Sequence, residues 1–415
     1  MSSSVPKIEG HATFYAHLRA GKVDKARIIG LDGDRFVEKI LFGRSYMEVP
    51  VITSRICGIC PVIHNVTSTK AVENALDIKV SEQVETLRKL MLCGQMVQSH
   101  SLHLYLLVLP DFMGMSSSFE LQKKHPDIFA DAVALKSYAD SIIEIIGGRA
   151  VHPVSNVPGG FKKFPEISEL RKLLEESKKM TDLGIKTLKL FQSFNYPEIS
   201  RKIIYSALSD LNEYAFYGGE IKTTSGENFK AKDYKKYIYE EILPYNRAKF
   251  GTLKGKEMMV GAIARINLNK KQLEKEIGSL KELGVGEELS DNPFGNIIAQ
   301  AIENYYFIVK SEAIIEKLIK EGISEESIVE PKKIDEGVAA CEAPRGTLFH
   351  YYKFDKEGML EKCDIVTPTV QNLPALEYDM KKLGPFLKDL DETERTEMIE
   401  MLIRSYDPCI TCATH

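Results

Sequence analysis

Apolar residues recur at helical spacing along the middle of the chain and alternate with polar residues near its two ends. The stretch HATFYAHL at His11–Leu18 alternates, and the apolar run KARIIGL at Lys25–Leu31 follows it closely. Alternation with a period of two is typical of a half-buried strand, so we expect an N-terminal hairpin or small sheet. Strand-like runs return at 337–342, 347–354 and 360–366, and the turn DKEG joins the last two.

Between these ends, apolar positions repeat every three to four residues over several long segments. The pattern predicts helices over Val62–Ala75, Glu82–Leu109, Pro126–Ile146, Glu166–Phe191, Pro293–Lys320 and Glu392–Tyr406. Proline and paired glycines end helices, so we expect the second helix to stop at Pro110 and the third at Gly147-Gly148. Several long, half-apolar helices in succession favour a helix bundle.

The fold class predicted is α+β, predominantly α, with a long-helix bundle core and small β-sheets or hairpins near the N- and C-terminal regions. The chain of 415 residues has no internal repeat and no obvious flexible linker, so we expect one interwoven unit. Its sub-regions are a β region with the first C-x-x-C at 1–60, a helical bundle at 61–195, a mixed α/β region with a helix at 196–330, and a β region with a helix and the second C-x-x-C at 331–415. Within the mixed region, EMMVGAIARI is strand-like.

Composition excludes several classes of protein. The net charge is -4 with acidic and basic residues interspersed, so no basic stripe is available for nucleic acid. No apolar run reaches the roughly 20 residues that span a bilayer, and the N-terminus lacks a secretory pattern, so we expect a cytoplasmic protein. In that compartment the seven cysteines favour thiols, metal ligands or redox groups over structural disulfides.

Four of these cysteines form two C-x-x-C motifs near opposite ends of the chain. Cys57 and Cys60 lie in RICGIC, and Cys409 and Cys412 lie in DPCITC. One such pair is typical of a thioredoxin-like redox couple, and two pairs are typical of a structural zinc site. Zinc ribbons usually take their ligands from one compact segment, however, and four thiolates suit iron or another late transition metal equally well.

The residues around the cysteines narrow the choice. Six motifs occur in order along the chain: IEGH at Ile8–His11, RICGICPVIH at Arg55–His64, GGRAVHPVSNVPGG at Gly147–Gly160, EAPRG at Glu342–Gly346, TPTVQN at Thr367–Asn372 and DPCITCATH at Asp407–His415. In these motifs the chain resembles the large, catalytic subunit of nickel-iron hydrogenases. TPTVQN, together with SHSLHLYLLVLPDF at Ser99–Phe112, is closest to the cytosolic nicotinamide-coupled or sulfhydrogenase-like branch.

The resemblance implies a nickel-iron centre held by the two motifs. Cys57 and Cys409 would be terminal nickel ligands, while Cys60 and Cys412 would bridge nickel to an iron that carries cyanide and carbon monoxide. Thiolates supply the soft field that nickel prefers. The three remaining cysteines, Cys93, Cys341 and Cys363, are interpreted as ordinary buried or partly buried thiols.

Further residues acquire roles through the same resemblance. Arg345 would hold its planar guanidinium above the open metal position. Thr369 would donate a hydrogen bond to a cyanide, and Leu348 and Pro368 would pack around the carbon monoxide. His64, four positions after Cys60, would support a bridging sulfur. Without the resemblance, Arg345 would be an ordinary ion-pair arginine and His64 an ordinary helix residue.

Proton transfer is assigned to a carboxylate. Glu9 in IEGH would lie beside Cys409 and accept its proton, provided burial raises the pKa of Glu9. Asp111 and Asp407 would complete a polar canopy with Arg345. Read from the pattern alone, Glu9 is a strand-end carboxylate and Asp111 a residue that follows a helix.

A second metal site is also implied. Glu38 would be the carboxylate ligand, with His415 and the backbone carbonyl of Ile365 as companions, and Mg2+ or another divalent ion would fit such oxygen-rich ligands. In the family, an endopeptidase removes a C-terminal extension after this histidine.

The sequence therefore predicts the catalytic subunit of a nickel-iron hydrogenase, which splits H2 reversibly and heterolytically. The electrons require an iron-sulfur small subunit as an obligatory partner, and flavin- and nicotinamide-binding subunits would carry them to NAD(P). Maturation proteins would supply the diatomic ligands. Two alternatives stay open: a structural four-cysteine zinc protein, and a hydrogen-sensing or non-catalytic relative.

Overall fold

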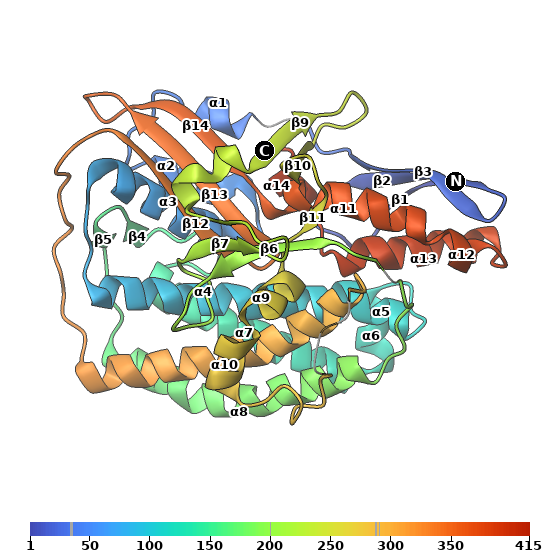
Figure 1. Ribbon diagram of the computed structural model, residues 1–415. Helices are drawn as coiled ribbons and strands as arrows, with labels where there is room; N and C mark the ends of the chain where they lie inside the picture. The colour runs from blue at the N-terminus through green and yellow to red at the C-terminus, as the bar shows by residue number, and fades with distance from the viewer. Residues whose placement is uncertain (34–35, 200, 287–288, 290) are drawn as a thin grey trace.

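The computed structural model describes residues 1–33, 36–199, 201–286, 289 and 291–415. Four long helices form one layer of the molecule, and small sheets with short helices form a second layer on top of it (Figure 1). The largest cluster of buried apolar side chains begins at Val5 and ends at Ala413, so it joins both layers.

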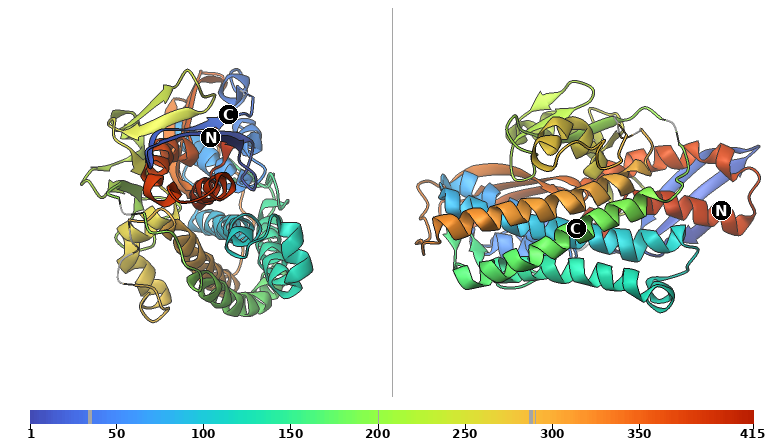
Figure 2. Two further views of the ribbon diagram at one scale, coloured as in Figure 1. Left: turned by 90° about the vertical axis from the view of Figure 1, so that its right-hand side faces the viewer. Right: turned by 90° about the horizontal axis from the view of Figure 1, so that it is seen from below.

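The lower layer is a bundle of four helices. α4 (Glu82–Leu102) packs against α7 (Pro126–Gly147), α7 against α8 (Ile167–Gln192), α8 against α10 (Gly295–Glu321), and α10 against α4, which closes the ring. The view from below shows these helices side by side along the length of the molecule (Figure 2). The predicted bundle is confirmed, and its helices begin and end within a few residues of the predicted positions.

Local signals in the sequence explain these boundaries. The Ser81 side chain accepts a hydrogen bond from the backbone N–H of Val84 and so caps the start of α4. Glu166 and Glu169 form a reciprocal capping box at the start of α8. α7 ends where Gly148 adopts a left-handed conformation with φ of 81°, which glycine reaches without strain.

Two three-stranded antiparallel sheets contain the predicted terminal strands. The first has the order β1 (Ser2–Ser4), β2 (Ala12–Arg19), β3 (Lys22–Gly30). The second has the order β12 (Glu336–Ala343), β13 (Gly346–Phe354), β14 (Leu360–Val366) and packs against α3. Within it, His350 pairs with Ile365. Both predicted β regions are confirmed.

The middle of the chain adds further sheets. A four-stranded sheet has the order β11 (Met258–Met259), β6 (Ile204–Ser209), β7 (Glu220–Thr223), β8 (Asn228–Phe229). Two two-stranded sheets are formed by β9 (Ile238–Ile242) with β10 (Lys249–Leu253), and by β4 (Asn156–Val157) with β5 (Gly160–Phe161).

The remaining helices are mostly short. They are α1 (Val37–Ile40), α2 (Val49–Thr53), α3 (Pro61–Leu76), α5 (Leu109–Phe112), α6 (Ser118–Lys124), α9 (Ala262–Ile277), α11 (Pro368–Lys382), α12 (Gly384–Leu387), α13 (Glu392–Ser405) and α14 (Ile410–Ala413), with 3-10 turns at Ser54–Ile56 and Ala231–Lys236. No helix in the described parts of the chain is long and apolar enough to cross a membrane.

Three elements differ from the prediction. The second predicted helix does not stop at Pro110, because a π-helical turn at His103–Val108 leads into α5, where proline lies in the first turn and lacks only an N–H that a helix start leaves unused. EMMVGAIARI is strand only at β11 and becomes helix from Ala262. α11 was not predicted, although Pro368 after Thr367 is a regular helix start.

Candidate metal centre

Each C-x-x-C motif lies at the start of a helix. Cys57 is extended after the 3-10 turn, and Cys60 immediately precedes α3. The backbone N–H groups of Ile59 and Cys60 point at the Cys57 sulfur, at 3.3 and 3.4 Å. Backbone donors and the positive end of a helix both stabilise a thiolate, so this turn is suited to an ionised sulfur.

The second motif meets the first across the whole chain. Cys409 precedes α14 and Cys412 lies within it. The Cys57 and Cys409 sulfurs are 3.5 Å apart, those of Cys60 and Cys412 are 3.4 Å apart, and each pair is separated by 352 residues in sequence. All four sulfurs lie within 4.8 Å of one another and are buried. The arrangement offers one metal or a close metal pair four sulfur ligands.

The pKa values of these four thiols shift in different directions. Hydrogen bonds from Cys409, Cys412 and Cys60 lower the pKa of Cys57 well below its ordinary value. Burial raises the pKa of Cys409 and of Cys412 well above the ordinary value. Four buried thiolates repel one another, so full ionisation requires a compensating cation. The donor set therefore fits a soft metal centre.

Glu9 reaches this cluster from the N-terminal sheet. It pairs with Cys409 in a parallel bridge, and the Ile410 N–H donates to the Glu9 carbonyl at 3.0 Å. The Cys409 thiol donates to Glu9 Oε2 at 2.8 Å, and the Thr411 hydroxyl donates to Oε1 at 2.6 Å. Burial, with the Cys57 charge, raises the pKa of Glu9. The predicted neighbour of Cys409 is therefore in contact with it, and Thr411 is a partner that sequence reasoning missed.

Arg345 lies at the tip of the hairpin that joins β12 to β13. The strands pair up to Ala343 and Gly346, which leaves only Pro344 and Arg345 in the loop. Gly346 has φ of 132°, and a Cβ there would lie 2.3 Å from a side-chain carbon of Val260, so only glycine fits this close approach. The short loop holds the arginine stem in a defined place.

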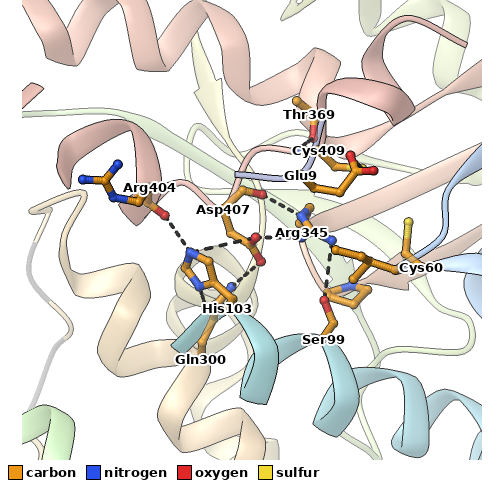
Figure 3. Close-up of polar contacts among 12 residues, drawn as sticks. Glu9, Cys60, Ser99, His103, Gln300, Arg345, Thr369, Arg404, Asp407 and Cys409 are labelled. Carbon is orange, nitrogen blue, oxygen red and sulfur yellow. Dashed lines mark hydrogen bonds and ion pairs between the residues drawn. The ribbon is translucent and has the colours of Figure 1, made fainter. Parts of the chain in front are cut away.

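The guanidinium is bound to Asp407 by two donors. Arg345 Nε donates to the Asp407 carbonyl and Nη2 to its carboxylate, both at 2.7 Å (Figure 3). Nη1 lies 3.5 Å from the Ser99 hydroxyl. Arg345 is only 4% exposed and lines one small pocket together with Cys60, Cys409 and other residues. The expected contact of Arg345 with Asp407 is thus present.

Asp111 lies elsewhere, which corrects the expectation that it joins this canopy. Its carboxylate forms ion pairs with Lys7 and with Arg404, the latter at 2.5 Å. Ser99 contacts Arg345 in its place. A π-helical turn at His103–Val108 lies between Ser99 and Asp111, and the pattern of apolar positions does not show such a turn.

The pocket that contains the cysteines also contains the other matched residues. Leu348, Pro368 and Thr369 line it with His64. Thr369 Oγ1 accepts a hydrogen bond from the Cys409 N–H at 3.0 Å, which leaves the hydroxyl hydrogen available to an acceptor. The pocket lining therefore includes both apolar and polar side chains.

A row of buried polar side chains leads away from the Cys412 sulfur. His64 Nε2 lies 3.6 Å from the Cys412 sulfur and its Nδ1 lies 3.2 Å from His350 Nε2. His350 Nδ1 contacts the Tyr352 hydroxyl at 2.5 Å, and that hydroxyl contacts Ser68 at 2.9 Å. Burial lowers the pKa of His350 well below its ordinary value, so the ring is neutral. His350 was not singled out from the sequence, although it lies four positions after Gly346.

Glu38 and His415 meet at a second location. Glu38 Oε1 lies 3.5 Å from His415 Nε2, a buried nitrogen that has no hydrogen-bond partner among the described residues. The backbone N–H of Ile365 donates to Glu38 at 2.8 Å, and Lys249 lies 3.4 Å from the same carboxylate. Although burial opposes it, the contact with His415 lowers the pKa of Glu38 to about 2. Burial raises the pKa of nearby Glu240 to about 7.

The three remaining cysteines lie outside both groups. Cys93 and Cys341 are buried and Cys363 is partly buried, and all three are free thiols. Burial raises the pKa of Cys93 to about 12, as in an ordinary core position.

Four buried thiols, one in contact with a carboxylate and three lining a pocket with a fixed guanidinium, define a redox metal centre, because a structural zinc site needs neither group. The family profile described as nickel-dependent hydrogenase matches residues 35–130 and 199–415. The chain belongs to this family. It is the catalytic, large subunit of a nickel-iron hydrogenase, and the zinc interpretation is excluded.

Relatives and solved structures agree with this assignment. The chain is 34% identical to the sulfhydrogenase 1 subunit alpha of Pyrococcus furiosus, over 99% of this chain and 96% of that one. It is 32% identical to the sulfhydrogenase 2 subunit alpha of the same organism, over 99% and 97%. Its fold matches a NAD+-reducing nickel-iron hydrogenase with a TM-score of 0.89 and 24% identity, covering 100% and 99% of the two chains. The nickel-iron-selenium hydrogenase of Desulfovibrio vulgaris Hildenborough matches with a TM-score of 0.77, 24% identity and the same coverage.

Proposed function

We propose that Cys57 and Cys409 are the terminal ligands of nickel and that Cys60 and Cys412 bridge nickel to iron. The single observation that carries the assignment is the hydrogen bond of 2.8 Å between Cys409 and Glu9, because a terminal thiolate that receives a proton from H2 needs an adjacent acceptor. When bound, the metal pair with its cyanide and carbon monoxide ligands polarises H2 and accepts its two electrons.

The side chains that line the pocket differ in polarity, and each kind suits a different diatomic ligand of the iron. The Thr369 hydroxyl, which is held by the Cys409 N–H, donates to a cyanide nitrogen. Leu348 and Pro368 surround carbon monoxide, a poor acceptor that is stable against apolar side chains. His64 donates to the Cys412 sulfur and so tunes its basicity.

Glu9 is the proton acceptor of the centre. Its raised pKa brings it closer to that of the thiol beside it, which favours transfer in both directions. Thr411 holds both carboxylate oxygens and keeps the acceptor in place. The Arg345 guanidinium, held by Asp407, provides a fixed positive charge beside the pocket where H2 is polarised.

Glu38 and His415 are ligands of a second, hard divalent ion such as Mg2+. The orphaned Nε2 of His415 and the low pKa of Glu38 support this role. The backbone carbonyl of Ile365 is the third ligand, while the N–H of Ile365 and the Lys249 ammonium both contact Glu38.

The electrons leave through a partner. Among the seven cysteines, only three lie outside the centre, which is too few for a four-cysteine iron-sulfur cluster. The relatives named above are alpha subunits, which supports an assembly with an iron-sulfur small subunit. Flavin- and nicotinamide-binding subunits then pass electrons to NAD(P), and maturation proteins install the metals.

Infrared spectroscopy of the purified complex, combined with elemental analysis, tests the proposal. We expect about one nickel per catalytic subunit, with iron in excess of nickel because the small subunit adds iron-sulfur clusters, together with carbonyl and cyanide stretching bands and turnover of H2 with a redox dye. Nickel without such bands in a fully matured sample would overturn the diatomic ligands. Bands without turnover would indicate a non-catalytic relative.

A further inference from the structure

A chain of hydrogen bonds continues from Arg345 away from the cysteines (Figure 3). Asp407 binds Arg345 with Oδ1, and its Oδ2 accepts from the Gln300 amide at 3.0 Å. The Gln300 amide oxygen contacts His103 Nδ1, and His103 Nε2 contacts the Arg404 carbonyl at 2.7 Å. All five residues are buried. The Asp407 carboxylate is therefore held from two opposite sides.

The donors and acceptors of this chain fix its orientation. Because the Asp407 carboxylate oxygens accept the hydrogen bonds of this chain, the NH2 of Gln300 faces Asp407 and its oxygen faces His103. The Arg404 carbonyl also only accepts. Both ring nitrogens of His103 thus face oxygen acceptors, and Asp407 Oδ1 lies 3.8 Å from the ring.

The same chain secures the turn that leads to Cys409. The Arg404 carbonyl is at the end of α13, and it also accepts the Asp407 N–H at 2.8 Å. Asp407 has φ of 50°, a left-handed conformation that follows many helices but is unfavourable for residues with a side chain. A side-chain donor at the last carbonyl groups of a helix stabilises the helix end. His103 therefore supports the backbone turn, and Gln300 supports its side chain.

We propose that Gln300 and His103 are positioning residues for hydrogen splitting: they hold Asp407 by its side chain and its turn, and thereby fix the Arg345 guanidinium beside the four cysteines. This inference rests on the proposed role of Arg345. The two residues act only through Asp407, so their removal changes where the guanidinium charge lies while the metal ligands stay.

The substitution Gln300→Met tests the proposal, because it keeps the length of the side chain and removes both amide contacts. A hydrogen bond to a charged group is lost, so we expect dye-coupled H2 oxidation to fall about 10-fold at unchanged metal content. The infrared carbonyl and cyanide bands should shift and broaden as the guanidinium samples more positions. Where Gln300→Met does not fold, His103→Gln replaces it, since one amide nitrogen cannot supply donors in two opposite directions.

Asn304 offers a matched control. It lies one turn further along α10, is fully buried, and donates to Ser101 at 3.0 Å. Asn304→Leu removes a buried amide from the same helix without touching Asp407, so stability should fall while the infrared bands keep their positions. Equal band shifts in Asn304→Leu and Gln300→Met would overturn the inference, because a general loss of packing would then explain both.

A double-mutant cycle separates this inference from the role of Arg345 itself. In an Arg345→Lys background, Gln300→Met should change the bands and the rate little, because the group it positions is gone. Additive effects overturn the inference. If Arg345→Lys alone leaves bands and rate as in the parent, the proposed role of Arg345 fails; if only Gln300→Met is silent, only the positioning role fails.

Discussion

The sulfur of Cys57 receives hydrogen bonds from its own turn and from three neighbouring thiols, an environment built for a thiolate. Serine in its place offers a hard, weakly acidic oxygen. We therefore expect Cys57→Ser to abolish nickel binding, measured by elemental analysis of the purified protein, and with it all H2 turnover.

Cys93→Ser is the matched control for this prediction. Cys93 is fully buried in α4 and lies outside the cluster, so the same exchange of atoms should lower stability modestly and leave the nickel content unchanged. Full nickel and activity in Cys57→Ser would contradict the assignment of the nickel ligands.

Substitution of Glu9 separates the splitting of H2 from the transfer of the released proton toward solvent. Glu9→Gln keeps the shape and the contact with Thr411 but cannot carry a proton, so dye-coupled H2 oxidation should fall steeply. Loss of a general base typically costs about 10²–10⁴-fold in rate, and the upper end is expected because the site is buried. Para/ortho hydrogen conversion, which needs splitting but little exchange with solvent, should decline much less.

Arg345→Lys provides the comparison, since an ammonium lacks the two parallel donors that bind Asp407. It should impair conversion and dye reduction together. Were Glu9→Gln to lower both activities in equal proportion, Glu9 would belong to the splitting step instead of the relay.

How far the sequence predicts individual residues depends on whether they lie in short motifs. Glu9, Arg345 and Asp407 are embedded in local patterns, and the structure brings all three to the cysteines. Ser99 opens the quoted stretch Ser99–Phe112 but received no role from it, and Gln300 lies on a long helix whose facing side is set by packing, so no local pattern singles Gln300 out. Asp111 was assigned through the family resemblance, and in the structure its carboxylate contacts Lys7 and Arg404.

At the level of elements, α3 packs tightly against β12 near the centre. A Cβ at Gly337 would lie 2.3 Å from the Ala75 nitrogen and 2.4 Å from the Ala71 oxygen, both backbone atoms that cannot swing aside. Gly337→Ala should therefore displace α3 from β12 and lower the free energy of unfolding by about 1–3 kcal/mol. Thermal unfolding of the variant measures this.

Because α3 begins directly after Cys60, the same variant should also bind less nickel. Gly33→Ala is the control, since a Cβ there meets only the end of the Arg247 side chain at 3.9 Å. Equal unfolding temperatures for the two variants would contradict this account of the α3 contact.

Long helices with a clear apolar face were predicted well, because period and caps agree along α7, α8 and α10. Short elements were not. EMMVGAIARI is mostly apolar between Glu257 and Arg265 and shows no clear period, so it does not indicate that the chain turns from strand to helix at Gly261, whose φ is 112°.

At the level of the whole molecule, the metal ties together two segments that are 352 residues apart. A ligand that binds only the folded chain raises its stability by mass action. We expect the metal-loaded protein to unfold at a clearly higher temperature than protein produced without nickel, as measured by scanning calorimetry. Cys57→Ser should show no such difference between the two growth conditions, and a difference there would mean that nickel stabilises the chain from another site.

The π-helical turn at His103–Val108 brings His103 and Asp111 to the same side of the helix, where both contact Arg404. His103 binds the Arg404 carbonyl and Asp111 binds its guanidinium. In an unbroken α-helix, side chains eight positions apart diverge by about 80°, but one inserted residue makes them equivalent to seven positions, about 20° apart. Deleting a single residue within Leu104–Val108 would let the turn relax to α-helix and keep both contacts. The chain length can therefore vary by one residue here while His103 and Asp111 still bind Arg404.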